Sequence, residues 1–441
     1  MWLLAPALAA PCPYGVNAHQ AADEALELAA EAGIGLVRFD MNWFQMEPSE
    51  GSYDWSIPDR FVDTAEALGL GVYMTVAYSP DWAVSGCNNS GDESAWCLNG
   101  HPDDPGDYTR FLTAAVSRYG DRVKHWGIWN EPNLSQFYRG TREQYTQQLL
   151  VPGSDAVHAA CSDCLVLGPD LANLRGAAWD SDAGTCVAGE CVFNGWEVSL
   201  TEILSDAGDS FDIITHHKYS DDATEWWDEL LYGEFLWTVQ YMHGAKEIID
   251  DYGQGQPVWL TEVGWESDPY GDVGDSYAAD QLEAVYRYAD YGTWPELEAV
   301  FWYDLHDDPS GYSWGLLDED LEPTTVYDAY AEVIADLGPC EVEEEEPAEE
   351  EEPADEEEPA DEEEDEESAD DDDDDGDDGD EPDPLEELGD DAGERGDPDG
   401  DASSEAPAGG CATGGVGSWA AAWLGVLWLR RRRGALSPEP A

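Results

Sequence analysis

The sequence predicts a (β/α)8 barrel over residues 12–340, followed by a disordered acidic tail and a hydrophobic anchor at the C-terminus. Three observations support this prediction. Short apolar runs rich in strand-forming residues alternate with helical patterns, which is typical of parallel sheets. Many of the runs end in a polar or charged residue, as strands do at the functional end of a barrel. A low-complexity block of Glu, Asp, Pro and Ala then fills residues 341–404, and such a block cannot form a core.

Eight such runs follow one another, and eight is the number of strands that closes this kind of barrel. The runs are almost wholly apolar, as expected of strands buried on both faces of the sheet. They are YGVNAH at 14, GLVRFDM at 35, GVYMTVAY at 71, HWGIWNEPN at 125, CLVLGPDLA at 164, FDIITHHKY at 211, PVWLTEVGW at 257 and AVFWYDLHD at 299.

Apolar residues at helical spacing occupy the segments between the runs, most clearly over 21–33, 57–69 and 108–120. Each of these segments ends in glycine, the usual residue just after the last turn of a helix. Strand and helix therefore alternate along the chain, and we expect the helices to surround the barrel.

The chain contains 101 acidic and 17 basic residues, which gives a formal net charge of -84 at pH 7. Nucleic acid and other polyanions would be repelled, so these partners are excluded. We interpret residues 341–409 as a solvated linker that its own charge extends. Calcium binding by this tail is an alternative, although DPDGD at 397 lacks a full twelve-residue ligand pattern.

The two ends of the chain indicate export. Residues 1–11 are apolar and end in small residues, like the second part of a signal peptide. Residues 410–434 contain Cys411, an apolar stretch and then four arginines, an order that resembles the MYXO-CTERM type of sorting signal. This resemblance implies a cell-surface or outer-membrane address, contact with a sorting machinery, and processing or attachment at Cys411. A simple single-span anchor is the alternative.

Nine cysteines are more than a reduced cytosolic enzyme usually carries, and their spacing suggests disulfides. A zinc site is the rival interpretation, but only one pair has CxxC spacing and no second such pair follows it. The expected bridges are Cys87 with Cys97, Cys161 with Cys164, Cys186 with Cys191, and Cys12 with Cys340.

Two glutamates end otherwise apolar runs on opposite sides of the predicted barrel. Glu131 lies in WNEPN after the fourth run, and Glu262 lies in LTEVGW on the seventh. Glycoside hydrolysis requires one carboxylic acid to protonate the leaving oxygen and one carboxylate at the anomeric carbon. A glutamate at a strand end is more often an ion-pair partner or a helix cap, but the pair across one barrel favours catalysis.

These two motifs, IWNEPN and LTEVGW, resemble the glycoside hydrolase clan A barrels, most of all family 39, with family 5 also near. The resemblance covers roughly residues 14–335. It implies that Glu131 is the acid/base and Glu262 the nucleophile of a retaining enzyme acting on β-linked glycans or β-glycosides. The substrate-binding residues that it implies are Arg38, Asn130, His217, Tyr219 and Trp302, with Trp302 as the platform under the sugar.

The resemblance also agrees with simple electrostatics. Arg38 is expected to favour the ionised form of Glu262, whereas burial and the charge across the cleft should keep Glu131 protonated near neutrality. Retention predicts carboxyl groups about 5–5.5 Å apart, against roughly 6.5–9.5 Å for inversion. No cofactor and no metal site is expected, because neither HExxH nor clustered ligand spacing is present.

Two alternatives remain open at this stage. Arg38 is either a site residue or a structural partner of Asp40, two positions further along the same run. The barrel is either an enzyme or a catalytically silent glycan-binding module or adhesin. Both glutamates facing each other argue for the enzyme.

Overall fold

A computed structural model of the chain describes most of residues 13–338. The exceptions within this range are 87–94, 135, 174–185, 188–189, 192–194, 221–222, 236–240, 268–275, 289–293 and 308–312. Residues 1–12 and 339–441 also lie outside the described part, so the predictions on the signal-like start, the acidic tail, Cys411 and the anchor fall there. Among the described helices, none has the length and apolar character needed to cross a membrane.

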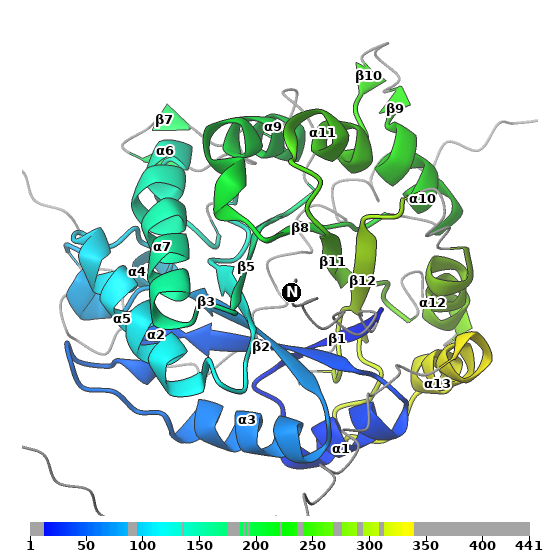
Figure 1. The fold of residues 1–441 in the computed structure, drawn as a ribbon. Helices are drawn as coiled ribbons and strands as arrows, with labels where there is room; N and C mark the ends of the chain where they lie inside the picture. Colours follow the sequence, from blue (N-terminus) through cyan, green and yellow to red (C-terminus); the bar gives the residue numbers. More distant parts are fainter. Residues whose placement is uncertain are drawn as a thin grey trace, which may run out of the picture. The chain divides into compact units, whose positions relative to one another are not determined.

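The predicted eight-stranded barrel is confirmed. Its strands are parallel and close into a ring in the order β1, β12, β11, β8, β5, β4, β3, β2 (Figure 1). All eight runs identified in the sequence form these strands. Their bounds are β1 Tyr14–His19, β2 Leu36–Asn42, β3 Gly71–Ala77, β4 His125–Ile128, β5 Leu165–Leu171, β8 Ile213–His217, β11 Val258–Val263 and β12 Leu297–Trp302.

The helices surround this ring (Figure 1). The longer ones are α1 Asp23–Glu31, α3 Ser56–Ala67, α5 Pro105–Tyr119, α7 Val151–Ala160, α9 Trp196–Ala207, α10 Ala223–Tyr232, α11 Ala245–Tyr252, α12 Ser276–Tyr288 and α13 Thr325–Leu337. Shorter turns are α2 Trp43–Met46, η1 Asp81–Ala83, α4 Ala95–Leu98, α6 Arg142–Gln144, η2 Tyr145–Leu150 and η4 Gly208–Ser210. Two-stranded ribbons are β6 Cys186–Val187 with β7 Glu190–Cys191, and β9 Glu234–Phe235 with β10 Tyr241–Met242.

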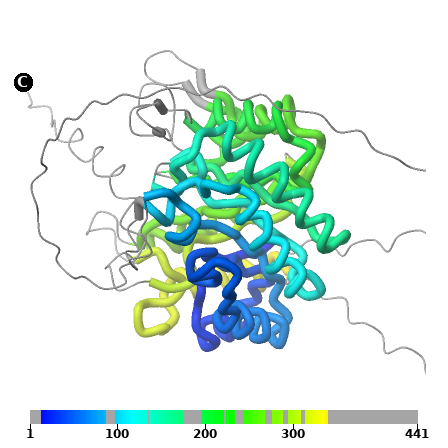
Figure 2. The backbone as a smooth tube through the Cα atoms, turned by 90° about the vertical axis from the view of Figure 1, so that its left-hand side faces the viewer, coloured from blue at the N-terminus to red at the C-terminus, as the bar shows by residue number. Residues whose placement is uncertain are grey.

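Glycine ends two of the three predicted helices in the expected way. Gly33 and Gly69 follow α1 and α3 with φ of 88° and 73°, a left-handed conformation that glycine adopts without steric cost. Gly120 follows α5 but keeps a right-handed φ of -65°. The first and last barrel strands, β1 and β12, pair directly with Val16 opposite Trp302. The first and last segments of the barrel therefore lie side by side (Figure 2).

The barrel interior consists of an apolar layer with a polar layer above it, nearer the strand C-termini. The apolar layer is formed by Leu36, Tyr73, Leu167, Ile213, Trp259, Ala299 and Phe301. Side chains two residues apart on a strand share a face, so Arg38, Thr75, Thr215 and Thr261 also point inward. Asn17 on β1 joins them, as does Asp170 on β5, where the strand register is irregular. None of the six is more than 2% exposed. This buried polar layer is the floor of the candidate site.

One predicted disulfide is confirmed, between Cys161 and Cys164. Cys97 is also disulfide-bonded, while its expected partner Cys87 lies outside the described residues. Cys186 and Cys191 stand opposite each other across the β6/β7 ribbon, which agrees with the predicted pairing at the level of the backbone. Cys12 and Cys340 lie outside the described residues, and their bridge stays a prediction.

Candidate active site

Glu131 and Glu262 meet inside the mouth of the barrel. Glu131 follows β4 and Glu262 lies on β11, so both stand at the C-terminal end of the strands. Their exposed fractions are only 1% and 5%. One oxygen of each carboxylate lies within 4.8 Å of the other and of a nitrogen of His217. The two carboxylates therefore face each other across the mouth of the barrel.

Glu262 is held as a carboxylate by two donors. Nη1 of Arg38 donates to its Oε1 over 2.6 Å, and the Tyr219 hydroxyl donates to its Oε2 over 2.9 Å. Charge-assisted bonds of this kind stabilise the ionised form. Both oxygens of Glu262 are therefore engaged, and its side chain has a fixed orientation.

Arg38 is itself oriented by the polar layer of the barrel. Besides Glu262, its guanidinium donates to Thr75 Oγ1 (2.8 Å), Asn17 Oδ1 (3.0 Å) and Asn130 Oδ1 (2.7 Å). A buried arginine with this many partners has one orientation, since each lost bond leaves an unpaired buried group. The alternative pairing with Asp40 is not what the structure has.

Asp40 instead belongs to a second polar group at the mouth. Its Oδ2 lies 2.8 Å from His19 Nδ1, and His19 Nε2 lies 3.5 Å from Asp304 Oδ2. Burial opposes the charged form of His19, but Asp40 and Asp304 raise its pKa well above the ordinary value. We call His19, Asp40 and Asp304 the mouth triad; it comes from the ends of β1, β2 and β12.

Glu131 has a different environment. Burial raises its pKa to about 7, and the charge of Glu262 adds to this, although His217 and Arg38 oppose it. Its Oε1 lies 2.8 Å from His217 Nδ1, whereas the buried Oε2 has no hydrogen-bond partner among the described residues. A carboxyl group that is half protonated near neutrality, with one oxygen unengaged, is suited to general acid and base catalysis.

The backbone around Glu131 is in an uncommon conformation that aims the side chain. Trp129 and Glu131 have φ of 72° and 42°, in the left-handed region that residues with a Cβ seldom adopt. β4 ends at Ile128, and the Glu131 N–H donates to the Asp170 carbonyl over 3.0 Å. Such strain of about 1–3 kcal/mol persists where surrounding bonds enforce it, often at functional sites.

His217 and Asn130 connect the two glutamates to the rest of the wall. His217 is completely buried and lies 3.3 Å from Glu262 Oε2 as well as next to Glu131. The Asn130 amide donates to the Tyr78 hydroxyl over 3.2 Å while its oxygen accepts from Arg38. The structure thus brings together six of the seven predicted site residues.

Trp302 is the exception, and the expectation that it forms the sugar platform is corrected by its burial. Its ring is 0% exposed, its indole N–H donates to the Trp314 carbonyl, and it packs against Trp265. A completely enclosed ring has no free face for a sugar. The next residue, Tyr303, is partly exposed and its ring contacts those of His19, Tyr219 and Trp314.

Asp170 is a site residue that the sequence analysis missed. It is fully buried at the end of β5, between Arg38 and His217. The sequence does contain a signal for it. Asp170 is the only charged residue in the run CLVLGPDLA, and it lies near a strand end, as the identified site residues do. Tyr78 and Tyr303 carried no comparable signal, because an aromatic residue in a strand usually indicates packing.

Glu131, Glu262 and His217 form a donor set that could geometrically hold a divalent cation. The two carboxylates already accept from Arg38, Tyr219 and His217, and the adjacent guanidinium would repel a metal. The arrangement therefore fits acid/base and nucleophilic chemistry by the side chains themselves.

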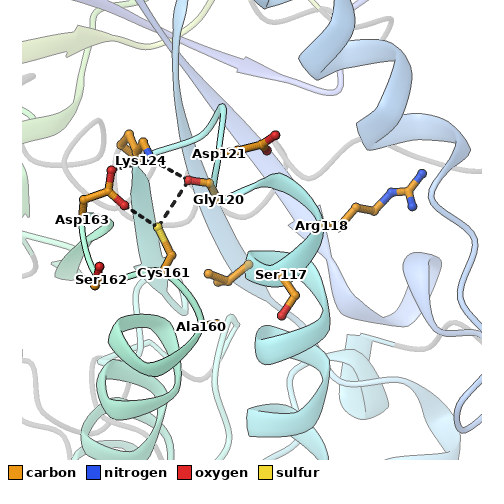
Figure 3. A pocket seen from close by; sticks show the side chains of 10 residues that line it. Ser117, Arg118, Gly120, Asp121, Lys124, Ala160, Cys161, Ser162 and Asp163 are labelled. Carbon is orange, nitrogen blue, oxygen red and sulfur yellow. Dashed lines mark hydrogen bonds and ion pairs between the residues drawn. The ribbon is translucent and has the colours of Figure 1, made fainter. Parts of the chain in front are cut away.

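A second hollow lies at the opposite end of the barrel (Figure 3). It is formed where α5 and α7 end and where the chain enters β4 and β5, so it is remote from the strand C-termini. Lys124 Nζ donates to the Gly120 carbonyl and pairs with Asp163 beside the Cys161–Cys164 bridge. These contacts join two barrel units, and we assign this end a structural role.

Comparison with known proteins agrees with this geometry. The beta-galactosidase model of glycoside hydrolase family 42 matches residues 16–140, which include Arg38 and Glu131 but not Glu262. A beta-xylosidase from Geobacillus stearothermophilus is 28% identical over 153 residues, which are 32% of this chain and 29% of that protein. The chain thus matches less than a third of this curated relative's length.

Solved structures show the same fold. A family 39 glycoside hydrolase from Bacteroides cellulosilyticus WH2 has a TM-score of 0.51 at 20% identity, covering 74% of this chain and 64% of that one. A glucosidase from Croceicoccus marinus has a TM-score of 0.51 at 16% identity, with 74% and 66% covered. The chain is thus a (β/α)8 barrel with partial sequence similarity to glycosidases, and it shares its fold with a family 39 enzyme.

Proposed function

We propose that this protein is a retaining glycoside hydrolase acting on β-glycosides or β-linked glycans. The observation that carries the proposal is the pair of facing carboxylates within 4.8 Å, one charged and braced by Arg38, the other with its pKa raised to about 7. Two acids in such unlike surroundings can take the two roles that the reaction requires. The relatives named beta-galactosidase and beta-xylosidase support the β-configuration.

The reaction follows from this arrangement in two steps. Glu131 donates its proton to the glycosidic oxygen while that oxygen leaves the anomeric carbon, and a Glu262 oxygen attacks the same carbon to form an ester. Glu131, now a carboxylate, takes a proton from water as the water oxygen attacks the anomeric carbon and releases Glu262. Two inversions give net retention.

The stereochemistry of the first product tests this proposal. Proton NMR during hydrolysis of an aryl β-glycoside by the full chain should show the β-anomer first, with the α-anomer appearing only by mutarotation. A panel of aryl β-xylosides, β-glucosides and β-galactosides provides the substrate. First formation of the α-anomer would establish inversion, and binding of glycans without any turnover would favour the silent-barrel alternative.

The mouth triad supports a more specific proposal, namely that the glycone is a neutral sugar. Glu131 protonates the leaving group, so the glycone extends from Glu262 toward β12, β1 and β2, where the triad lies. Asp304 has a buried Oδ1 without a hydrogen-bond partner among the described residues. Carboxylate oxygens accept hydrogen bonds from sugar hydroxyls but repel another carboxylate.

We therefore expect kcat/KM for an aryl β-glucuronide to be about 100-fold or more below that for the β-glucoside. This ratio corresponds to the repulsion between two like charges in contact near a protein surface. Asp304→Asn should narrow this gap by raising the relative rate of the glucuronide. Asp63→Asn on the outer face of α3 removes the same charge and serves as the control. A preference for the glucuronide would exclude a neutral glycone.

We also propose that the barrel acts outside the cell, attached through its C-terminus. The Cys161–Cys164 bridge supports this address, since disulfides persist in oxidising compartments. Cell fractionation can test it.

A further inference from the structure

Asp170 is a third carboxylate inside the barrel, and the two-step reaction described above does not use it. It is 0% exposed, one layer below the two glutamates. An ionised carboxylate at such depth is costly unless every oxygen is paired. Its partners therefore indicate what it does.

Both oxygens of Asp170 are engaged by polar side chains. Oδ2 accepts from Arg38 Nη2 (3.2 Å) and from the Tyr73 hydroxyl (2.5 Å), while Oδ1 accepts from Thr261 Oγ1 (2.5 Å). Burial opposes ionisation, but Arg38 and His217 hold the pKa of Asp170 well below its usual range. A Cβ at Gly127 would collide with the Tyr73 ring, so this glycine gives Tyr73 the space in which it reaches Asp170.

Oδ1 of Asp170 also faces His217, at 3.6 Å from Nε2. The other ring nitrogen, Nδ1, lies 2.8 Å from Glu131 Oε1 and 3.3 Å from Glu262 Oε2. One imidazole thus stands between three carboxylates from β5, the β4 end and β11. Burial favours its neutral form, yet Glu262, Asp170 and Glu131 together raise the pKa of His217 to about 9.

The basic residues around His217 have other partners. Arg38 bonds to Glu262 and Asp170. Lys218 pairs with Glu229 over 2.6 Å. The His216 ring packs against Trp196, and burial keeps its pKa well below the ordinary value, so it adds no charge. The charge on His217 is therefore set by the three carboxylates.

Two of these carboxylates change during the reaction, while Asp170 stays ionised. Esterification of Glu262 removes one of them, just when Glu131 has lost its proton and must remain ionised to act as a base. We propose that Asp170 is a positioning residue that keeps His217 protonated in the covalent intermediate, so that the imidazolium stabilises the Glu131 carboxylate for the second step. This inference rests on the proposed retaining function.

Asp170→Asn should therefore slow deglycosylation more than glycosylation. A 2,4-dinitrophenyl β-glycoside has a leaving group so good that the second step limits turnover. With this substrate we expect kcat to fall about tenfold or more, the effect of raising the Glu131 pKa by one unit. kcat/KM, which reports the first step, should change less than about threefold. Stopped-flow traces should show a full burst of dinitrophenolate, and intact-protein mass spectrometry should show the glycosyl-enzyme accumulating.

Tyr73→Phe is the matched control, because it removes one hydrogen bond to Asp170 and keeps its charge. It should leave the ratio of kcat to kcat/KM nearly unchanged. Equal loss of kcat and kcat/KM in Asp170→Asn, without accumulation of the intermediate, would show a merely structural role and overturn the proposal.

A measurement on the wild-type protein covers the case in which Asp170→Asn does not fold. Nitrogen-15 NMR of histidine in the enzyme trapped with a 2-deoxy-2-fluoroglycoside should show both His217 nitrogens protonated at pH 7, and a neutral ring would contradict the proposal. Failure of the wild type to hydrolyse any glycoside would refute the proposed function instead, so the two failures are distinguishable.

Discussion

Replacing Glu262 by glycine is expected to lower turnover of aryl β-glycosides by about 10⁴-fold or more, because this carboxylate supplies the oxygen that attacks the anomeric carbon. Arg38 and Tyr219 both donate to Glu262, so its removal takes away the carboxylate that these two donors orient. Steady-state hydrolysis of a dinitrophenyl glycoside, followed by absorbance, measures the loss.

Sodium azide provides the control for this variant, because a small anion can enter the space that the side chain leaves. Azide should restore turnover and give the α-glycosyl azide, the product of a single inversion. Glu66→Gln on the exposed side of α3 should retain full activity. A Glu262→Gly enzyme within tenfold of wild type would assign the nucleophile elsewhere.

Replacing Glu131 by glutamine should have the second largest effect, and its size should depend on the leaving group. For alkyl or sugar leaving groups, which need a proton, we expect a loss of about 10²–10⁴-fold. For dinitrophenolate, which leaves without a proton, kcat/KM should change little. A uniform loss for all leaving groups would contradict the assignment of Glu131 as the acid.

The same variant should change the pH profile. Glu131 acts as the acid in its protonated form, and its pKa is about 7, so wild-type kcat/KM should fall as the pH rises through 7. His217, with a pKa of about 9, stays protonated over this interval. Glutamine does not titrate, so the alkaline limb near pH 7 that the wild type shows with an alkyl or sugar leaving group should disappear in Glu131→Gln.

The fold was predictable from the sequence because each barrel strand is a separate short run with its own local signal. The eight runs are largely apolar on both faces, since helices cover one side and the filled interior lies on the other. Glu131, Glu262 and Tyr219 were identifiable as polar residues near the ends of such runs, and Arg38 as a charged residue within one. The Cys161–Cys164 bridge needed only the spacing between the two residues.

Other features depended on atoms brought together from distant parts of the chain. The sequence placed Trp302 at a strand end but did not show that Trp265 and Trp314 enclose its ring. The pairing of Asp40 with His19 instead of Arg38 also depends on how side chains from β1 and β2 turn. Neighbours in space, and not the residue types, decided both outcomes.

The sequence by itself thus determined the barrel, the two opposed glutamates and the cation beside one of them, because period and motif are local properties. Only the tertiary structure decided the separation of the carboxylates, the raised pKa of Glu131 and the role open to Asp170. These properties depend on burial and on charges contributed by strands far apart in the chain, such as Arg38 and Glu262, which are 224 residues apart. Electrostatic interactions act through distance in space, which the order of residues along the chain does not record.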